Sequence, residues 1–282
     1  MRVTRWAGVL ALALFMTFGL AGSALGQEAP KAPAAMQPMA ADADPSFAVA
    51  TIKPSKPDEV VTRIPPVGYR TVLPMITVLK LVSFAYDLHN EQVVGAPQWI
   101  GSETFDFEGV SDTQGRPDVE QLKTMIQKLL VDRFQLKFHW EKRELPAYVL
   151  AVGKKGAKLD KSKEDVHGSQ TFFIKQNGPA SRTLTAKNVG VTELAHMMQF
   201  NMLDRPVVDQ TGLQGTYDFV LTWAPDESQA TQDGTKAPSP NGEPDVPGLF
   251  TAVQEQLGLK LSAAKTEVEV MVVDRVEQPS PN

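Results

Sequence analysis

The sequence predicts an α+β protein built from two related repeats, with helices packed on antiparallel sheets. Three observations predict this class. Stretches of alternating apolar residues, typical of strands, are interspersed with stretches of helical spacing. The order strand, helix, two strands, helix, two strands occurs twice, over residues 46–153 and 171–276. Each helical stretch is apolar along one face only, so it needs a sheet to cover that face.

Length and composition bound the possible functions. The chain has 282 residues, of which 42% are hydrophobic and 22% charged, and a formal net charge of −5. This is the composition of a globular protein with one large domain or two small ones. The acidic balance, without any run of five like charges, argues against nucleic-acid binding. The chain has no cysteine, which excludes disulfides, thiol chemistry and Cys-based zinc sites.

Residues 1–26 have the pattern of a secretory signal peptide. Arg2 and Arg5 form the positive region, and the apolar stretch Trp6–Leu20 follows. That stretch is shorter than the roughly 20 residues of a transmembrane helix. We therefore expect an exported protein, periplasmic or extracellular, with no membrane span after cleavage; an uncleaved anchor is the alternative. Residues 27–45, rich in Ala and Pro, are expected to form a disordered linker.

In the first repeat, apolar spacing predicts a strand, a helix, two short strands, a second helix and a hairpin. The helix over Val119–Asp132 has the strongest pattern, because Asp118 can act as its N-cap and Gln121 can close a capping box. The hairpin is expected to turn at Leu145–Pro146. In order, we expect these elements at residues 47–52, 75–88, 93–94, 105–110, 119–132, 134–140 and 148–152.

The second repeat follows a charged loop over residues 154–170 and contains the densest local pattern of the chain, Arg205–Phe219. There, two valines precede a turn with Gly212 and Gly215, and an alternating apolar run follows, which is the layout of a β-hairpin. The other expected elements are strands at 171–174 and 183–186, a helix at 191–198, a disordered insertion at 226–244, a helix at 249–257 with Gly258 as its C′ residue, a strand pair at 259–261 and 268–273, and a tail at 277–282.

The two repeats align block by block, although their sequence identity is low. Chance similarity between two α+β modules is the alternative to a duplication. The aligned blocks are Ile76–Val82 with Val189–Ala195, Val93–Val94 with Val207–Val208, Phe105–Phe107 with Tyr217–Phe219, Asp118–Leu130 with Asp245–Leu257, Phe134 and Leu136 with Leu259 and Leu261, and Tyr148–Val152 with Val270–Val273.

Motifs of common catalytic sites are missing from the sequence. It has no His-x-x-x-His zinc pattern, no Gly-x-Ser-x-Gly nucleophile turn and no glycine-rich phosphate loop. We therefore assign no catalytic residue, no metal site and no cofactor. Asp106 and Asp218 occupy equivalent positions between aromatic residues, so they could form a pair of carboxylates. Alternatively, strand alternation turns each of them away from two buried rings.

Three further residues are candidates for binding. Arg205 and Asp209 could form an ion pair or capture an anionic group, or could stabilise the turn. Trp99 could pack in the core, or could mark a partner surface if it is exposed. The candidate binding residues are Arg205, Asp209, Asp218, Asp106 and Trp99.

Several stretches resemble one protein family. Phe47–Ser55, Gly95–Ile100 and Leu129–Phe134 are similar to N-terminal signatures of a large group of uncharacterised, soil-associated bacterial secreted proteins. Arg205–Phe219 and Phe250–Leu261 resemble its C-terminal signatures. The resemblance implies an exported protein of unknown function. Some relatives look fused to BlaR-type sensor metallopeptidases, which implies an extracytoplasmic sensing or binding role.

The sequence thus favours a non-enzymatic extracytoplasmic binding, interaction or sensing module. An exposed sheet edge, or a groove between the repeats, would bind a peptide, a glycan or an envelope protein. The alternative is a carboxylate-dependent hydrolase that acts on envelope or environmental polymers through Asp106 and Asp218.

Overall fold

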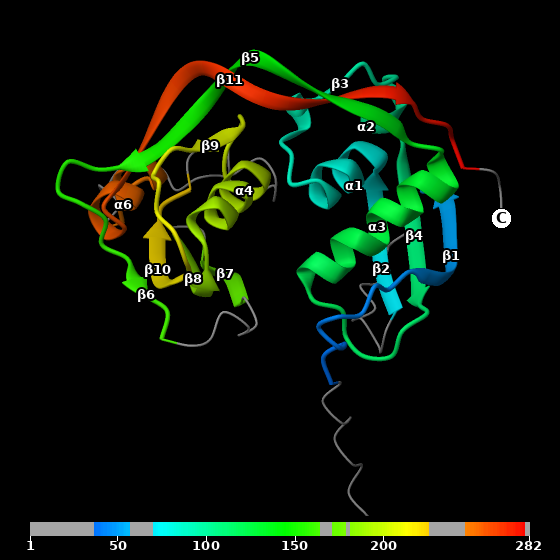
Figure 1. The fold of residues 1–282 in the computed structure, drawn as a ribbon, viewed down its shortest axis with the longest axis horizontal. Coiled ribbons are helices and arrows are strands. Elements are labelled where there is room, and N and C mark those ends of the chain that lie inside the picture. The colour runs from blue at the N-terminus through cyan, green and yellow to red at the C-terminus, as the bar shows by residue number, and fades with distance from the viewer. Residues whose placement is uncertain (1–36, 57–69, 164–170, 179–180, 226–245, 280–282) are drawn as a thin grey trace, which may run out of the picture. The chain divides into compact units, whose positions relative to one another are not determined.

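The computed structural model describes residues 37–56, 70–163, 171–178, 181–225 and 246–279 (Figure 1). The fold described below belongs to the part of the chain that begins at Met36. The expected signal peptide and the expected insertion at 226–244 lie outside the described residues. Within the described ranges, no helix combines the length and the apolar character that crossing a membrane requires.

Part of the expected linker contacts the first repeat. Pro38 forms an isolated bridge with Arg116, and Met39 N donates a hydrogen bond to Arg116 O at 2.9 Å. Met39 is buried, although its neighbours in sequence are mostly small or polar. Burial of one large apolar side chain can hold a short stretch that composition alone describes as a linker. Residues 37–45 are therefore placed against the fold.

The first repeat forms an antiparallel sheet in the order β1-β4-β2 (Figure 1). Alternate residues of β4, including Phe105 and Phe107, are buried in one cluster with residues of α1 and α3. The capping box expected for α3 is confirmed: Gln121 N donates to Asp118 Oδ1, and Asp118 N donates to Gln121 Oε1. The elements are β1 (Phe47–Pro54), β2 (Arg70–Thr77), α1 (Val78–Ala85), η1 (Asn90–Gln92), β3 (Val93–Val94), α2 (Trp99–Ser102), β4 (Thr104–Ser111) and α3 (Val119–Phe134).

The second repeat forms a sheet in the order β6-β10-β8-β7. Alternate residues of β8 and β10, such as Leu184 and Leu221, are buried with residues of α4 and α6. The α+β class is confirmed. The elements are β6 (Asp160–Lys161), β7 (Thr171–Asn177), β8 (Ser181–Val189), α4 (Val191–Asn201), β9 (Val207–Asp209), β10 (Tyr217–Trp223) and α6 (Leu249–Gln256).

A third sheet contains the two long strands β5 (Lys137–Val152) and β11 (Leu259–Arg275), which run side by side in Figure 1. They pair antiparallel, with β3 and β9 parallel at the edges, in the order β3-β11-β5-β9. The hairpin expected to end the first repeat, and the separate pair of strands expected to end the second, are therefore wrong. Each is one continuous strand, and Leu145–Pro146 is not a turn.

Pro146 is tolerated inside β5 because the N–H that proline lacks would have no backbone acceptor among the described residues at this position. Tyr148 N points toward the β9 side of β5, where it donates to Pro206 O at 2.8 Å. By the two-residue alternation of a strand, the nitrogen of Pro146 points to the same side. β9 begins at Val207, opposite Tyr148, so it does not extend alongside Pro146. Proline is tolerated at such a site.

The two repeats exchange strand ends. Leu150, near the end of β5, is buried in the core of the second repeat. Met271 and Val273, near the end of β11, are buried in the core of the first repeat. Each core therefore contains apolar side chains from the other repeat. The middle of the sheet β3-β11-β5-β9 has a small apolar cluster of its own, around Ala147, Val268 and Val270.

The hairpin expected over Arg205–Phe219 is also wrong. β9 pairs with β5, whereas β10 pairs with β8 and β6 in another sheet. The expected turn residues Gly212 and Gly215 do have positive φ angles, of 66° and 90°. They lie in a connection between two sheets rather than in a hairpin turn. The residues of a turn do not determine which strand the next strand pairs with, so the pattern alone could not predict this.

The third sheet has equivalent parallel pairings in the two repeats: the short strand of each repeat pairs with the long strand of the other repeat. Val93 of β3 pairs with Met271, and Val207 of β9 pairs with Tyr148. The residue just after α3, Gln135, and the C′ residue after α6, Gly258, are both left-handed, with φ of 52° and 66°. Leu136 therefore corresponds to Leu259, two residues from the alignment expected. A slip of two residues keeps the same face of a strand, so the apolar pattern could not resolve it.

Candidate functional site

The structure places Asp106 at a β-bulge of the first sheet. Its Oδ1 accepts hydrogen bonds from Ser55 Oγ at 2.7 Å and from Met75 N at 2.9 Å. Met75 has a φ of 51°, and the β2–β4 register shifts between Leu73 and Ile76. The carboxylate thus stabilises a left-handed residue that would otherwise be strained.

Asp218 makes the same contacts in the second sheet. Its Oδ1 accepts from Ser162 Oγ at 2.6 Å and from Asn188 N at 2.8 Å. Asn188 has a φ of 56°, next to a register shift between β10 and β8. The Ser162 hydroxyl and then the Asn188 N–H hold the pKa of Asp218 below its usual range. Each candidate carboxylate is thus bonded within its own sheet, which supports the duplication and gives each Asp a role in the fold.

Arg205 and Asp209 are engaged with different partners. The Arg205 guanidinium carbon lies 5.6 Å from the centroid of the Tyr148 ring, and its Nε lies 3.5 Å from Asp204 Oδ2. Asp209 Oδ1 accepts from Thr211 N at 2.8 Å and from Thr211 Oγ1 at 2.7 Å, as in an Asx turn.

Asp209 also reaches the first turn of α4, where its Oδ2 accepts from Thr192 Oγ1 at 3.0 Å. This residue therefore fastens the turn after β9 to a helix, the turn-stabilising alternative. Trp99 is partly buried on the core of the first repeat, with its ring centroid 6.4 Å from that of Phe105. Its contacts are those of a packing residue.

The free edge of the second sheet presents exposed apolar side chains. β7 is the last strand in the sheet order, and every one of its residues is exposed. Phe172 is 42% exposed, Phe173 60% and Ile174 37%. Register pairs Phe172 with Ala186 and Ile174 with Leu184, both buried, so these two side chains project on the core side of the sheet.

The opposite face of the same sheet combines apolar and cationic side chains. Phe173 pairs with Thr185, which pairs with Val220 on β10, so the three share this face. Lys175 and Lys187 lie on it as well, by the two-residue alternation, and both are exposed. β7 and β8 together contain three cationic residues and no acidic one. This surface is not recognisable in the sequence, because an apolar run normally signals burial.

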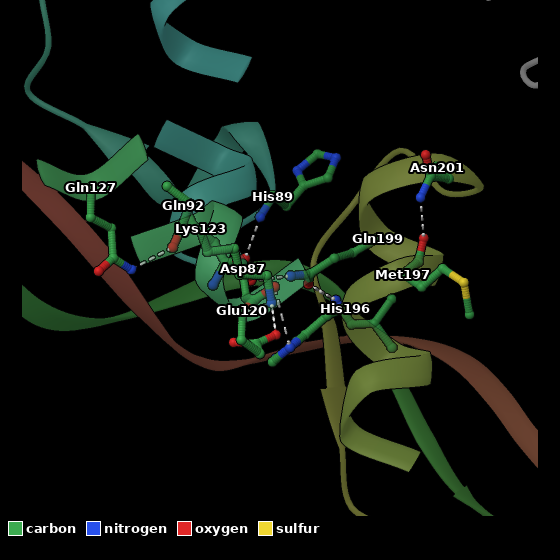
Figure 2. A network of polar contacts seen from close by, with 12 residues as sticks. Asp87, His89, Gln92, Glu120, Lys123, Gln127, His196, Met197, Gln199 and Asn201 are labelled. Atoms are coloured by element: carbon green, nitrogen blue, oxygen red, sulfur yellow. Dashed lines mark hydrogen bonds and ion pairs between the residues drawn. The ribbon is translucent and has the colours of Figure 1, made fainter. Parts of the chain in front are cut away.

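A polar network joins the end of α1 to α3 and α4 (Figure 2). Lys123 Nζ donates to Asp87 Oδ2 and to Glu120 Oε1, both at 2.7 Å, and His196 Nδ1 lies 3.8 Å from Asp87 Oδ1. Burial alone would lower the pKa of Lys123, but the hydrogen bonds with Asp87 and Glu120 outweigh burial and raise this pKa. The network therefore contains a charged lysine.

Gln199 of α4 completes this connection and is 4% exposed. Its Nε2 donates to Asp87 O at 2.6 Å, and its Oε1 accepts from Val207 N at 2.9 Å. One buried amide thus satisfies two backbone groups and connects the repeats (Figure 2).

A small pocket of about 130 Å³ lies beside this network. Lys80, His89 and Asp204 contribute its charged and titratable groups. Burial, ahead of the opposing charge of Glu91, lowers the pKa of His89. The lining residues are Lys80, Leu88, His89, Asn90, Gln199, Phe200, Leu203 and Asp204. In the part of the chain that the structure describes, no three acidic or histidine side chains gather as a metal site would require.

Comparison with known proteins gives one informative result. A family model described as a protein of unknown function, DUF3738, matches residues 79–276. This range extends from α1 to just after β11 and so includes both exchanged strands. Neither the curated proteins nor the solved structures give a match.

Proposed function

The chain belongs to the DUF3738 family of proteins of unknown function, and we propose that it is an exported, non-enzymatic module that binds an extended peptide segment of an envelope protein along β7. The observation that carries this function is the exposure of all seven residues of β7 at a sheet edge.

A free strand edge offers main-chain groups for pairing. Along one side, β7 pairs with β8 from Thr171–Lys187 to Asn177–Ser181. The other side has no strand beside it among the described residues. Natural edges are usually blunted by proline, bulges or charge, and of these β7 has only Lys175. A seven-residue edge of this kind suits the addition of a strand from a partner.

The side chains around the edge define the chemistry of the segment. Phe172 and Ile174 on one face, and Phe173 on the other, favour apolar residues in the partner strand. Lys175 and Lys187 favour carboxylates. A second copy of β7 would bring its own lysine, so the partner we propose is an acidic, apolar extended segment of another protein.

The apolar contribution sets the expected affinity. A Phe side chain has about 200 Å² of surface, so the exposed fractions of Phe172 and Phe173 leave on the order of 200 Å² to bury. At about 25 cal/mol per Å² this contributes ~5 kcal/mol, which only offsets an association cost of about 4 kcal/mol or more. Main-chain hydrogen bonds, at about 1 kcal/mol each, supply the rest. We therefore expect dissociation constants in the micromolar range.

Export is part of the same proposal and rests on the pattern of residues 1–26. A phosphatase reporter that is active only outside the cytoplasm, fused after residue 45, tests it. Activity is expected for the natural sequence and should be lost when Arg2→Glu and Arg5→Glu are combined. An inactive fusion with the natural sequence would contradict export.

Hydrolysis by paired carboxylates has no observation in its favour. Asp106 and Asp218 each accept two hydrogen bonds that stabilise a bulge, and they lie on strands of different sheets. We therefore propose no second function.

Selection of displayed peptides tests strand addition directly. A library of random ten-residue peptides would be selected on the immobilised full chain, and the enriched sequences synthesised with a fluorophore. Their dissociation constants would then be measured for the natural protein and for Phe173→Glu. We expect enrichment of alternating apolar and acidic sequences and an affinity loss of at least tenfold in the variant, because the new carboxylate repels them.

Val220→Glu is the matched control. Val220 is 55% exposed on the same face, but it lies on β10, which is separated from the edge by β8 and β7. This variant should change affinity by less than threefold. Selection of no consistent sequence, or an equal loss in the two variants, would remove the support for β7 as the binding edge.

A further inference from the structure

The pocket between the end of α1 and the end of α4 has an unusual charge arrangement. It is independent of β7, since none of its lining residues belongs to the second sheet. Lys80 and Asp204 both line it, yet no ion pair joins them. Two opposite charges around one small space, not paired with each other, match a ligand that carries both charges.

Lys80 is available to bind an anion. Its Nζ lies 5.1 Å from the centroid of the Phe200 ring. This cation–π contact involves the face of the ring and leaves ammonium hydrogens that can donate to a ligand. Across the described ranges of the chain, no carboxylate pairs with this ammonium, whereas Lys123 nearby has two. A lysine ammonium has three donors, so Lys80 can donate to a carboxylate in the pocket.

Asn90 supplies a second donor. Its Oδ1 accepts from Ser83 Oγ at 2.8 Å, which fixes the orientation of the amide. The Nδ2 group keeps two donor hydrogens, with no acceptor for them among the described residues. Lys80 and Asn90 together therefore form a donor set for one carboxylate.

Asp204 is held in place as the negative group. Tyr148 Oη donates to Asp204 Oδ1 at 3.0 Å, and Arg205 Nε lies 3.5 Å from its Oδ2. These contacts use only part of the acceptor capacity of the carboxylate, which can accept about four hydrogen bonds. His89 does not add a charge, because its Nδ1 accepts from Glu91 N at 3.3 Å and so suits the neutral imidazole.

Volume limits the ligand. The pocket has a volume of only about 130 Å³. Pockets for larger organic ligands start near 300 Å³, so nucleotides and oligosaccharides are too large. Leu88, Phe200 and Leu203 add apolar walls that tolerate a small aliphatic side chain.

We propose that this pocket binds a small α-amino acid, with the carboxylate of the ligand on Lys80 and Asn90 and its ammonium on Asp204. α1 and α4 belong to different repeats, so the bound amino acid contacts both.

Calorimetric titration of the full chain tests the site with named probes. L-alanine and glycine carry both charges, acetate carries only the carboxylate and ethylamine only the ammonium. We expect L-alanine to bind at least tenfold more tightly than either single-charge probe. Lys80→Gln should weaken L-alanine at least tenfold, and Asp204→Asn, which can still accept from Tyr148, should weaken L-alanine but leave acetate unchanged.

Lys128→Gln provides the matched lysine control, because Lys128 pairs with Asp44 outside the pocket. It should bind L-alanine as the natural protein does. Thermal unfolding of each variant separates loss of binding from loss of fold. If acetate binds as tightly as L-alanine, if Asp204→Asn leaves L-alanine affinity unchanged, or if no probe binds to the folded protein, the assignment is overturned.

Discussion

Gln199→Leu should destabilise the protein strongly, because one side chain satisfies two backbone groups. Its removal leaves the Val207 N–H and the Asp87 carbonyl without their partners. A buried polar group left unsatisfied costs about 1–3 kcal/mol, so two cost ~2–6 kcal/mol. The extra apolar surface of leucine recovers roughly 1–2 kcal/mol. The net loss we expect is on the order of 1–4 kcal/mol in the free energy of unfolding.

Urea unfolding followed by tryptophan fluorescence measures this loss. Thermal unfolding should show the same effect, since about 2–4 °C in Tm corresponds to 1 kcal/mol for a domain of 150–250 residues. Gln254→Leu makes the same substitution on the exposed face of α6 and should stay within about 0.5 kcal/mol of the natural protein. If the two variants unfold at the same urea concentration, Gln199 does not connect the repeats as argued.

Three further predictions concern the stability of the fold. Asp106→Ala and Asp218→Ala should lower Tm by similar amounts, and by more than Asp44→Ala, because each removes two bonds at a bulge; unequal shifts in thermal scans would argue against equivalent roles. Gly258→Ala should lose ~2 kcal/mol or more beyond Gly212→Ala in urea unfolding. Both glycines have φ of 66°, but only at Gly258 would an added Cβ clash with a backbone oxygen, that of Gly156. Equal losses would show that this contact relaxes. Hydrogen bonds that the His139 ring donates to Asp274, and then to Glu141, raise the pKa of His139 above 6.5. Its contribution to stability is therefore complete below pH 6.5 and is lost as pH rises through the folded-state pKa. NMR titration should show the raised pKa, and His139→Asn should flatten the fall in Tm over that range.

Local signals in the sequence predicted local structure well. The capping box of Asp118 and Gln121 starts α3, and Gly258 follows α6 in the left-handed conformation. Both signals involve residues within one helical turn, so no distant partner is needed to interpret them. The α+β class follows from the same local periods.

Partners of the strands could not be predicted in the same way. The alternation of β5 and β11 is the same whether each folds into a hairpin or continues across to the other repeat, because period two reports only which face is buried. Leu150 therefore looked like part of the first core, yet it is buried in the second. The pocket was equally hidden, since Lys80 and Asp204 are far apart in sequence and belong to no motif.

Differences between the repeats are better guides to function than their similarities. Asp106 and Asp218 looked like paired catalytic groups because both repeats have them, and the structure gives each the same task at a bulge. A residue that stabilises the repeated fold is expected at the equivalent position of both repeats. β1 and β2 flank β4 as β6 and β8 flank β10, so β7 is left without a counterpart in the first sheet.

Lys80 also breaks the equivalence of the repeats, since its counterpart in the second repeat is Glu193. Lys80 lines the pocket, whereas Glu193 has the opposite charge and does not line it. The two residues therefore cannot have the same role in stabilising the repeated fold. β7 has a free edge on one side among the described residues, and no carboxylate of the described residues pairs with the Lys80 ammonium. The two proposed binding features therefore lie where the repeats differ, whereas Asp106 and Asp218, which stabilise the bulges, are common to both repeats.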